Sequence, residues 1–327
     1  MRRDLFVEAE RFPLAAAFTI SRGSKTEAAV LTCTIRMGEA QGRGECVPYA
    51  RYGETLESVQ AEIEAAREPI EAGVSRQELP EIMKAGAARN AVDCALWDLD
   101  AKLSGRRVAE EICTTQPHAL TTAYTISLGD PEEMAASARK HAARPLLKVK
   151  VGTGDDISRI EAVARAAPES RIILDANEGW SAENIRDHLL VAARHRIALI
   201  EQPLPAGKDD ILRTIPHPVP ICADESVHTA DHLDELLGLY DAINIKLDKT
   251  GGLTGALTLK RRARELGFGV MVGCMVGTSL AMAPAVLVAQ DAEFVDLDGP
   301  LLLATDRNPP LVYDGSLVSP PAPALWG

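Results

Sequence analysis

The sequence predicts an α/β protein in which a small α+β domain is followed by a parallel barrel. Two observations predict this arrangement: strand-like segments precede helical ones in the first third of the chain, whereas strands and helices alternate after Thr121. At roughly 150 residues per domain, the 327 residues allow two domains or one large barrel with an attachment. With 46% hydrophobic and 25% charged residues, the composition excludes collagen-like, coiled-coil and wholly disordered chains.

The first domain is predicted from three short strands and two longer helical segments. The sequence GEAQGRGEC supplies a turn before the third strand. Ala91, Ala95 and Leu99 recur at helical spacing in the second helix, which Gly105 ends. Strands followed by segregated helices are typical of an α+β domain. The first two strands and the two helical segments are expected over residues 4–12, 28–36, 55–73 and about 85–103.

The rest of the chain alternates between short apolar runs and amphipathic segments. Such alternation requires a parallel sheet, and eight strand candidates favour a closed barrel over an open doubly wound sheet. The strand candidates, in order, are TAYTISL, LLKVKV, RIILDAN, ALIEQPL, PICADES, AINIKLD, GVMVGCM and FVDLDGP. The helices between them are expected over residues 131–143, 156–167, 181–195, 229–239, 253–266 and 279–290.

Charge and cysteine content restrict what the protein binds and where it works. Lys and Arg number 35 against 47 Asp and Glu, so the net charge of −12 gives no electrostatic reason to bind nucleic acid. The six cysteines form no C-x-x-C pair, so we expect a reducing compartment, the cytoplasm. No signal-peptide core occurs near the N-terminus. The uncharged stretch 266–290 is interpreted as a buried strand, a Gly-rich turn and a buried helix rather than a membrane span.

Three acidic residues stand at the ends of successive strand candidates. Asp175, Glu201 and Asp224 each follow an apolar run, and the gaps of 26 and 23 residues are each about one βα unit. All strand C-termini of a parallel barrel meet at one face, so these carboxylates should converge. Because they would repel one another without a cation, we predict a site for Mg²⁺, Mn²⁺ or Ca²⁺. The alternative is that each residue only caps a strand end or a turn.

Three lysines are predicted to face the same site. Strand alternation puts Lys148 and Lys150 on one face, and Lys246 approaches from the far side of the carboxylates. A lysine near a cation and another lysine should have a lowered pKa, so two lysines could remove a proton from either face of a bound carbon. Surface ion pairs are the alternative. Lys249 and Lys260 lie outside the strand and are assigned to the surface.

These residues make the sequence resemble the enolase superfamily, in its muconate-lactonizing subgroup, and most closely the dipeptide epimerases. The resemblance covers essentially the whole chain. The metal-and-lysine set is specific to the subgroup, whereas the acidic pair of VDLDGP and three segments of the first domain resemble the epimerases acting on Ala-Glu. The motifs that carry the resemblance are ISRGSKTEA, PYARYGE, GAARNAVDCALWDL, LKVK, ILDANEGW, IEQPL, ADES, NIKLDKTGGLT, GCM and VDLDGP.

The resemblance implies a fold, a domain arrangement and a class of partner. The fold is a modified TIM barrel, (β/α)7β-like, with an N-terminal α+β capping domain. The capping domain would cover residues 1–115 and the barrel residues 116–300, and residues 301–327 would pack back on the capping domain. The implied partner is a small dipeptide, with neither nucleic acid nor membrane, and the resemblance allows a homo-oligomer.

The resemblance also implies a reaction and a role for each site residue. The reaction is Mg²⁺-dependent epimerisation of dipeptides, most closely L-Ala-D-Glu and L-Ala-L-Glu, by 1,1-proton transfer through a metal-stabilised enediolate. Mn²⁺ is the alternative ion. Lys150 and Lys246 would be the two acid/bases, with Lys148 stabilising negative charge and Asn177 supporting the site from behind. The metal ligands would be Asp175, Glu201 and Asp224. The substrate would be bound by Asp296 and Asp298 at its amino terminus, by Arg22 at its acidic side chain, and by pocket residues Thr125, Cys274 and Val276.

The acidic pair on the last strand separates this function from its alternatives. A buried ammonium group needs a counter-charge, which Asp296 and Asp298 supply, although Asp before Gly-Pro is also a turn or helix N-cap signal. Muconate cycloisomerase and o-succinylbenzoate synthase share the metal and the lysines, but their substrates have no amine. A sugar-acid dehydratase would need a His that GVMVGCM lacks. A Schiff-base aldolase barrel could use a lysine but would not need three carboxylates on successive strands.

Overall fold

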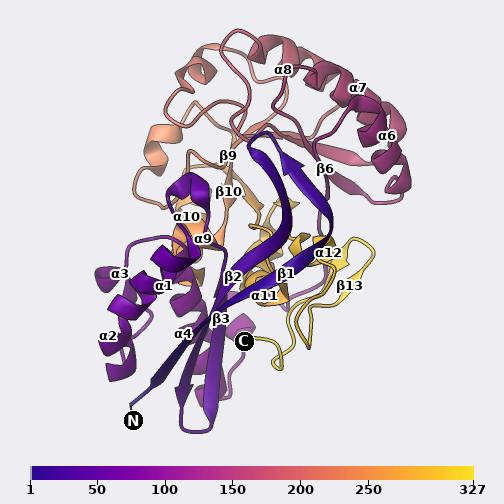
Figure 1. Cartoon of the computed structure of the whole chain (residues 1–327). Coiled ribbons are helices and arrows are strands. Elements are labelled where there is room, and N and C mark those ends of the chain that lie inside the picture. Colours follow the sequence, from indigo (N-terminus) through magenta and orange to yellow (C-terminus); the bar gives the residue numbers. More distant parts are fainter. Residues whose placement is uncertain (1) are drawn as a thin grey trace.

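The computed structural model describes residues 2–327 and contains two parts built from different sheets. A three-stranded antiparallel sheet with helices forms the N-terminal part, and a curled eight-stranded parallel sheet forms the larger part (Figure 1). This architecture confirms the fold class that the alternation of strand and helix patterns predicts.

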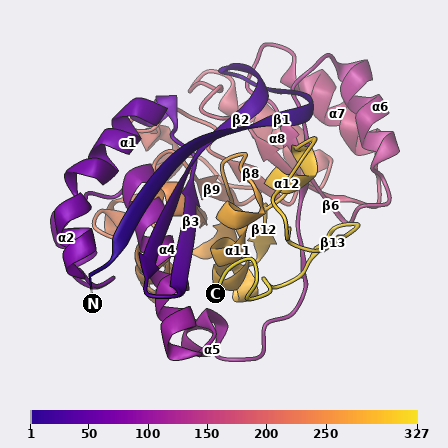
Figure 2. The same ribbon diagram turned by 60° about the horizontal axis from the view of Figure 1, so that its bottom comes forward.

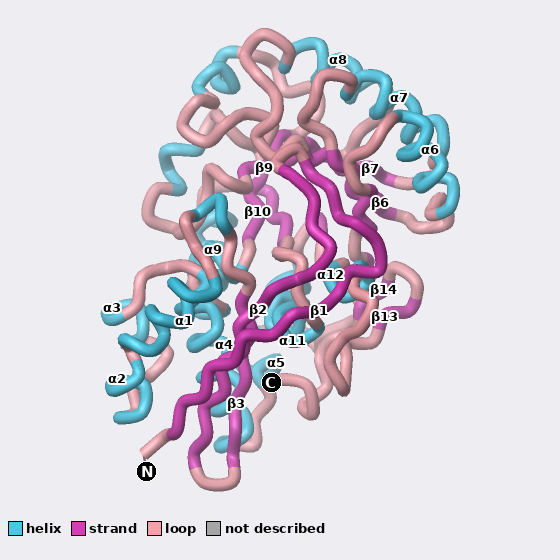
Figure 3. Tube along the Cα trace, viewed as in Figure 1, coloured by secondary structure: helices cyan, strands magenta, loops and turns pink. Residues whose placement is uncertain are grey.

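A long β-hairpin extends from the antiparallel sheet toward the barrel (Figures 1 and 3). Pairing was expected to end near residue 12, but it continues to Ile20 and Gly23, past a register shift between Pro13 and Phe18. The added residues are mostly small or polar, so they lack the apolar alternation on which the prediction rests. The strands of this sheet are β1 (Asp4–Ile20), β2 (Gly23–Met37) and β3 (Ala40–Cys46).

Helix α4 (Ala87–Ser104) packs directly on β3 and supplies seven of the eighteen buried residues in the core of the capping part. A Cβ atom on Gly42 would lie 2.1 Å from the carbonyl oxygen of Ala95, and one on Gly44 would lie 2.2 Å from that of Ala91. Both glycines are therefore required for this close approach of helix and strand. The other helices of the capping part are η1 (Ala50–Tyr52), α1 (Leu56–Ala65), α2 (Arg67–Ala72), α3 (Leu79–Ile82) and α5 (Val108–Ile112).

The eight parallel strands follow one another around the curled sheet in chain order. The Ala123 N–H donates to the Val295 carbonyl at 2.8 Å, which brings the two edges of the sheet together. Seven buried side chains, including Ile173 and Met271, fill its interior below the strand ends. The strands are β5 (Tyr124–Ile126), β6 (Leu146–Lys150), β7 (Arg171–Asp175), β8 (Leu199–Glu201), β9 (Ile221–Ala223), β10 (Ala242–Ile245), β11 (Gly269–Val272) and β12 (Phe294–Val295).

Helices cover the outside of this sheet (Figure 2). Two connections contain only short 3-10 turns, η2 (Asp210–Thr214) and η3 (Leu233–Leu236), so the helix predicted over 229–239 is wrong. Leu237 bridges to Tyr240 and Gly238 has a left-handed φ of 76°, which ends the helical winding after one turn. The α-helices of the barrel are α6 (Pro131–Lys140), α7 (Asp156–Ala166), α8 (Ile185–Arg194), α9 (Leu247–Thr250), α10 (Leu253–Glu265) and α11 (Ser279–Val288).

The uncharged stretch 266–290 contains β11, a turn and all of α11, and its side chains are largely buried. Within residues 2–327, every helix is too short or too polar to cross a membrane.

The chain after β12 returns to the capping part. Arg307 pairs with Glu10 and Glu45, and the indole N–H of the fully buried Trp326 donates to the Cys94 carbonyl at 3.0 Å. These contacts join residues more than 200 positions apart in the sequence. The elements after β12 are α12 (Gly299–Leu302), β13 (Tyr313–Asp314) and β14 (Leu317–Val318), which pairs with β4 (Leu120–Thr121). The 3-10 turn η4 (Ala289–Asp291) lies between α11 and β12.

Candidate active site

Charged residues at the C-terminal ends of β6 to β10 form one buried cluster. In the parallel register Lys150 pairs with Asp175, and Asp175 pairs with Glu201. Asp175 and Glu201 are wholly buried, as is nearly all of Asp224 just beyond β9. The strand ends therefore bring the three predicted carboxylates and three predicted lysines to one face of the barrel.

The ammonium group of Lys148 lies at the centre of this cluster. Its Nζ is 3.0 Å from Asp175 Oδ2, 2.6 Å from Glu201 Oε2 and 2.7 Å from Asp296 Oδ2. One lysine thus links the carboxylates of β7 and β8 with the acidic pair that follows β12.

Lys150 and Lys246 lie at opposite ends of the row of carboxylates. Lys150 Nζ is 2.6 Å from Asp175 Oδ2, whereas Lys246 Nζ is 2.6 Å from Asp224 Oδ2 and 3.8 Å from Glu201 Oε1. A carbon held over Glu201 would therefore have one lysine on each side, which is the geometry that a two-base proton transfer requires.

The carboxylates determine the electrostatics of these lysines. Burial lowers the pKa of Lys246, but the charges of Asp224 and Glu201 more than offset this effect, so its pKa lies well above the ordinary lysine value. The same balance raises the pKa of Lys148. The lowered pKa predicted from the sequence assumes a bound cation beside the lysine, whose charge would oppose that of the carboxylates, in the same direction in which Lys148 acts on Lys246. Burial and the charge of Asp175 raise the pKa of Glu201 to about 7.

The donor set of the cluster fits a hard divalent cation. All three side chains offer carboxylate oxygens, the ligand atoms that hard divalent cations prefer. Glu201 Oε2 is buried and accepts no hydrogen bond, although its ion-pair partner Lys148 Nζ lies 2.6 Å away. Neighbouring groups fix their orientation: the Asn177 N–H donates to Asp175 Oδ1 at 2.9 Å, and Asn244 Nδ2 donates to Glu201 Oε1 at 2.7 Å. Within residues 2–327, no three His, Cys, Asp or Glu side chains already form a ligand cage, since lysines lie between the carboxylates.

The two aspartates after β12 differ in their partners. Asp298 Oδ2 accepts the backbone N–H of Thr125 at 2.7 Å, and its side chain makes no capping bond to α12 although it occupies the N-cap position. Asp296 Oδ1 is buried without a hydrogen-bond partner. Burial and the charge of Asp296 raise the pKa of Asp298. Asp296 Oδ1 is therefore a buried carboxylate oxygen that can still accept a hydrogen bond, and helix α12 does not use it.

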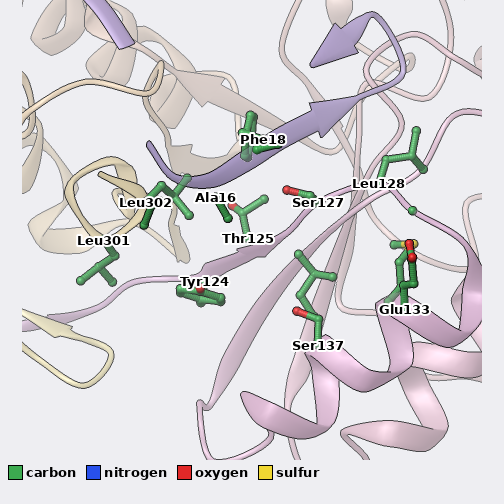
Figure 4. A pocket seen from close by; sticks show the side chains of 15 residues that line it. Ala16, Phe18, Tyr124, Thr125, Ser127, Leu128, Glu133, Ser137, Leu301 and Leu302 are labelled. Carbon is green, nitrogen blue, oxygen red and sulfur yellow. The ribbon is translucent and has the colours of Figure 1, made fainter. Parts of the chain in front are cut away.

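The remaining predicted pocket residues are divided between two pockets. Arg22 and Val276 line a pocket of about 720 Å³ under the hairpin, whereas Thr125 lines another of about 300 Å³ beside β5 (Figure 4). Cys274 lines neither of these pockets and packs against the core between the sheet and its helices. Phe18 of β1 lines both pockets, and its ring centroid lies 5.8 Å from Lys150 Nζ.

The guanidinium group of Arg22 is already engaged by the protein. It donates to the Asn177 carbonyl at 2.9 Å, to Tyr49 Oη at 2.9 Å and to Glu225 Oε1 at 2.8 Å, and it pairs with Glu178 at 3.2 Å. A substrate carboxylate at Arg22 would therefore join or replace one of these acceptors, which the sequence alone does not show.

Lys249 was assigned to the surface, but it is the most completely buried lysine of the site. Its Nζ donates to Asp224 Oδ1 at 2.5 Å, to the Asp224 carbonyl at 2.6 Å and to the Asn244 carbonyl at 3.0 Å. The signal that could have found it is its spacing of three residues from Lys246, since one helical turn of α9 returns it to the same side. Lys260 pairs with the exposed Asp291, but its own side chain is partly buried and donates to the Val288 carbonyl at 2.6 Å.

The chain belongs to the enolase superfamily. Residues 2–112 match the family described as "Mandelate racemase / muconate lactonizing enzyme, N-terminal domain", and residues 133–323 match "Enolase C-terminal domain-like". This confirms the family that the strand-end motifs indicate.

Several relatives are similar to the chain over nearly its whole length. The L-Ala-D/L-Glu epimerase of Escherichia coli is 45% identical, over 95% of this chain and 98% of its own. The N-acetyl-D-glutamate racemase of a Pseudoalteromonas species is also 45% identical, over 88% and 92%. These relatives are isomerases acting on amino acid derivatives, the enzyme class that the site residues suggest.

Two solved structures resemble the fold closely. An enolase family member from Agrobacterium tumefaciens with homology to dipeptide epimerases, containing sodium and L-Ala-L-Glu, is 63% identical with a TM-score of 0.98, over 99% of this chain and all of its own. A dipeptide epimerase from Enterococcus faecalis, complexed with Mg and L-Leu-L-Tyr, is 28% identical with a TM-score of 0.91, over 98% of each chain.

Proposed function

We propose that this protein is a Mg²⁺-dependent dipeptide epimerase that interconverts L-Ala-D-Glu and L-Ala-L-Glu. The observation that carries the proposal is the position of Lys150 and Lys246 at opposite ends of the row formed by Asp175, Glu201 and Asp224. The similarity to an E. coli enzyme of this activity supports it.

Asp175, Glu201 and Asp224 would hold the metal ion. Bound Mg²⁺ would supply positive charge to the substrate carboxylate and make the neighbouring α-proton more acidic. Mg is present with a dipeptide in the E. faecalis relative, and Mn²⁺ has the same preference for oxygen ligands.

The lysines would move the proton. Nζ of one of Lys150 and Lys246 would take the α-proton from its side of the carbon, and Nζ of the other would return a proton on the opposite side, which inverts the centre. Lys148 would neutralise the negative charge that develops between them, because its ammonium already contacts Asp175 and Glu201.

Asp296 and Asp298 would bind the protonated amino terminus of the dipeptide. The partnerless Oδ1 of Asp296 is the acceptor that this ammonium group would use. Arg22, in the pocket lined also by Val276, would hold the acidic side chain of the second residue, while Thr125 fixes Asp298 and Cys274 limits the space behind the pair.

An N-acylglutamate racemase is the second candidate, because one such relative is as similar to this chain as the dipeptide epimerase. An N-acetyl group carries no positive charge, so it would add no counter-charge for the two buried carboxyl groups beyond that of Lys148, whose Nζ lies 2.7 Å from Asp296 Oδ2. The acidic pair therefore favours the dipeptide.

The test compares the two substrates in the parent enzyme and in the double variant Asp296→Asn/Asp298→Asn. We expect kcat/KM for L-Ala-L-Glu to fall by orders of magnitude in the variant, with Mg²⁺ affinity retained, since neither residue is a proposed ligand. Arg22→Ala should weaken the preference for Glu over neutral second residues. Exchange of the α-proton in D₂O, followed by NMR, measures each rate. A parent enzyme that prefers N-acetylglutamate, or a double variant with parent-like activity on Ala-Glu, would contradict the proposal.

The resemblance to Ala-Glu epimerases also supports a role in recycling murein peptides. The six cysteines form no disulfide with one another, which supports the reducing cytoplasm as the compartment.

A further inference from the structure

The tip of the β1–β2 hairpin meets the barrel at the loop that follows β7. Ser21 Oγ donates to the Asn177 carbonyl at 3.3 Å, and Arg22 Nη1 donates to the same oxygen at 2.9 Å. Both hydrogen bonds join residues more than 150 positions apart. Two consecutive residues of the hairpin tip thus bind the same backbone carbonyl of the barrel, and Arg22 also pairs with Glu178 and Glu225.

Asn177 connects this contact to the candidate acid/base on the same side. Its side-chain Oδ1 accepts from Lys150 Nζ at 3.2 Å, while its own N–H donates to Asp175 Oδ1 at 2.9 Å. Its φ of 44° lies in the left-handed region, which asparagine tolerates better than most residues. Its N–H, side-chain and carbonyl groups therefore face Asp175, Lys150 and the hairpin.

The packing around Asn177 leaves little room for independent movement. A Cβ atom on Gly152, two residues after Lys150, would lie 2.3 Å from the Ala176 carbonyl oxygen and 3.1 Å from Ser21 Cβ. The loop after β6, the loop after β7 and the hairpin tip are therefore in direct contact, so a shift of the tip displaces the loop that follows Lys150 and the loop that carries Asn177.

Lys246 has no such connection. Its ion-pair partners within residues 2–327 are Asp224 and Glu201, both on the barrel, and no hydrogen bond links its side chain to the hairpin. Arg22 also donates to Glu225 Oε1 at 2.8 Å, next to Asp224, but within residues 2–327 Asp224 itself makes no hydrogen bond to the hairpin, so the connection to Lys246 is less direct than the one through Asn177.

We infer that Asn177 is a positioning residue that couples docking of the hairpin tip to the orientation of Lys150. This inference rests on the proposed function, because it assigns Lys150 and Lys246 to opposite faces of the α-carbon. Docking then assists proton transfer on the Lys150 face more than on the Lys246 face. Loss of this coupling lowers one of the two half-reactions selectively.

The experiment measures α-proton exchange in D₂O separately for L-Ala-D-Glu and L-Ala-L-Glu. The Lys150→Ala variant first identifies the isomer that Lys150 serves, namely the one whose exchange it loses. The readout for every other variant is the exchange rate of that isomer divided by the rate of the other isomer. This ratio cancels effects on folding, on metal content and on binding common to both isomers.

Asn177→Gly permits the left-handed backbone and removes the side chain, with the amide that contacts Lys150. We expect it to lower the ratio about 10-fold, because small misplacements of a reacting group reduce rates by one to two orders of magnitude. Arg22→Ala should lower the ratio in the parent background, but by less than about two-fold in the Asn177→Gly background, since its effect passes through Asn177. Ser24→Ala is the matched control: Ser24 lies at the same tip but hydrogen-bonds only to Thr19, so the ratio should stay unchanged.

The results distinguish failure of the inference from failure of the proposed function. If Asn177→Gly slows both isomers equally, or if Arg22→Ala and Asn177→Gly change the ratio independently, the coupling does not exist. A parent enzyme that exchanges the α-proton of neither isomer would overturn the two-base function itself, and the inference with it.

Discussion

The two lysine-bearing ends of the site are held in different ways. On the Lys150 side, the capping part makes its contacts through Arg22 and Arg51, whose side chains are 27% and 39% exposed and which pair with Glu178. On the Lys246 side, Arg22 reaches Glu225, and the further contacts come from buried groups: Asn90 Nδ2 donates to Asp248 Oδ1 at 2.7 Å. Exposed ion pairs are weak and sensitive to salt, whereas buried hydrogen bonds are costly to leave unmade.

The Lys246 end is also fixed from within the barrel by Lys249. Helix α4 adds Arg89, which donates to the carbonyls of Thr250 at 2.8 Å and Gly251 at 3.1 Å. Lys150 and Lys246 are thus supported differently, although both are lysines proposed for the same reaction. The contacts near Lys150 are partly exposed ion pairs that can adjust, whereas those near Lys246 are buried hydrogen bonds that hold their groups rigidly.

Removal of the metal ion should disable both ends at once and has the largest expected effect. Chelation followed by dialysis should abolish epimerisation, and added Mg²⁺ should restore it, because the α-proton is otherwise too weakly acidic for a lysine. The measurement is the rate of L-Ala-L-Glu epimerisation with and without EDTA. Full activity in excess EDTA would reject the roles proposed for Asp175, Glu201 and Asp224.

Replacing one lysine at a time separates the two ends. Lys150→Ala and Lys246→Ala should each stop net epimerisation, while each variant still exchanges the α-proton of one isomer, a different isomer in each case. Deuterium incorporation measured from each pure isomer tests this. If both variants still exchanged the α-proton of the same isomer, the lysines would not serve opposite faces of the α-carbon.

Lys249→Met tests the rigidity of the Lys246 end. Loss of the ammonium group removes a buried partner of Asp224, so we expect a decrease of about 3–5 kcal/mol in the free energy of unfolding. Lys84→Met is the control: the Lys84 side chain is 81% exposed and lies 3.8 Å from Glu62, and the expected decrease is below about 1 kcal/mol. Urea unfolding measures both, and equal effects would contradict the distinction between buried and surface lysines.

The smallest effect concerns pH and the contact between Asp248 and α4. Burial raises the pKa of Asp248 to about 7, despite hydrogen bonds from Val47 and Asn90, so the folded protein binds this proton more tightly than the unfolded chain. The resulting stabilisation is complete below pH ~4 and disappears as the pH rises through about 7.

Asp248→Asn, which does not titrate, is the comparison. From pH 4 to 7 the parent should lose up to about 3 kcal/mol of unfolding free energy relative to this variant. Unfolding measured at several pH values gives the difference, and parallel curves for the two proteins would show that Asp248 keeps an ordinary pKa.

Much of the fold could be predicted because the barrel depends on local periodicity. Each strand of the barrel is a short apolar run, and residues one βα unit apart fall at the same face, which is why Asp175, Glu201 and Asp224 were found together. The hairpin beyond residue 12 was not predicted, since its pairing depends on partner strands rather than on apolar alternation. The helix expected over 229–239 failed because Gly238 and the Leu237–Tyr240 bridge end it early.

Within the site, the sequence could indicate which side chains converge but not what each one already contacts. Lys249 looked like a surface residue because its three acceptors lie in other segments or on backbone carbonyls. Arg22 looked available for a substrate carboxylate, yet Glu225, 203 positions away, already accepts from it. Such contacts depend on distances in space that no periodicity encodes.

The burial of Trp326 against α4 has a consequence for how the chain is made. The Gly327 N–H bonds to Asp98, 229 positions earlier, and Arg43 donates to the Leu325 carbonyl. At 5–20 residues per second, a ribosome needs on the order of 10 to 50 s to extend the chain from α4 to these residues. Throughout that time α4 carries an uncovered apolar surface, so the part of the molecule that is synthesised first is the last to be completed.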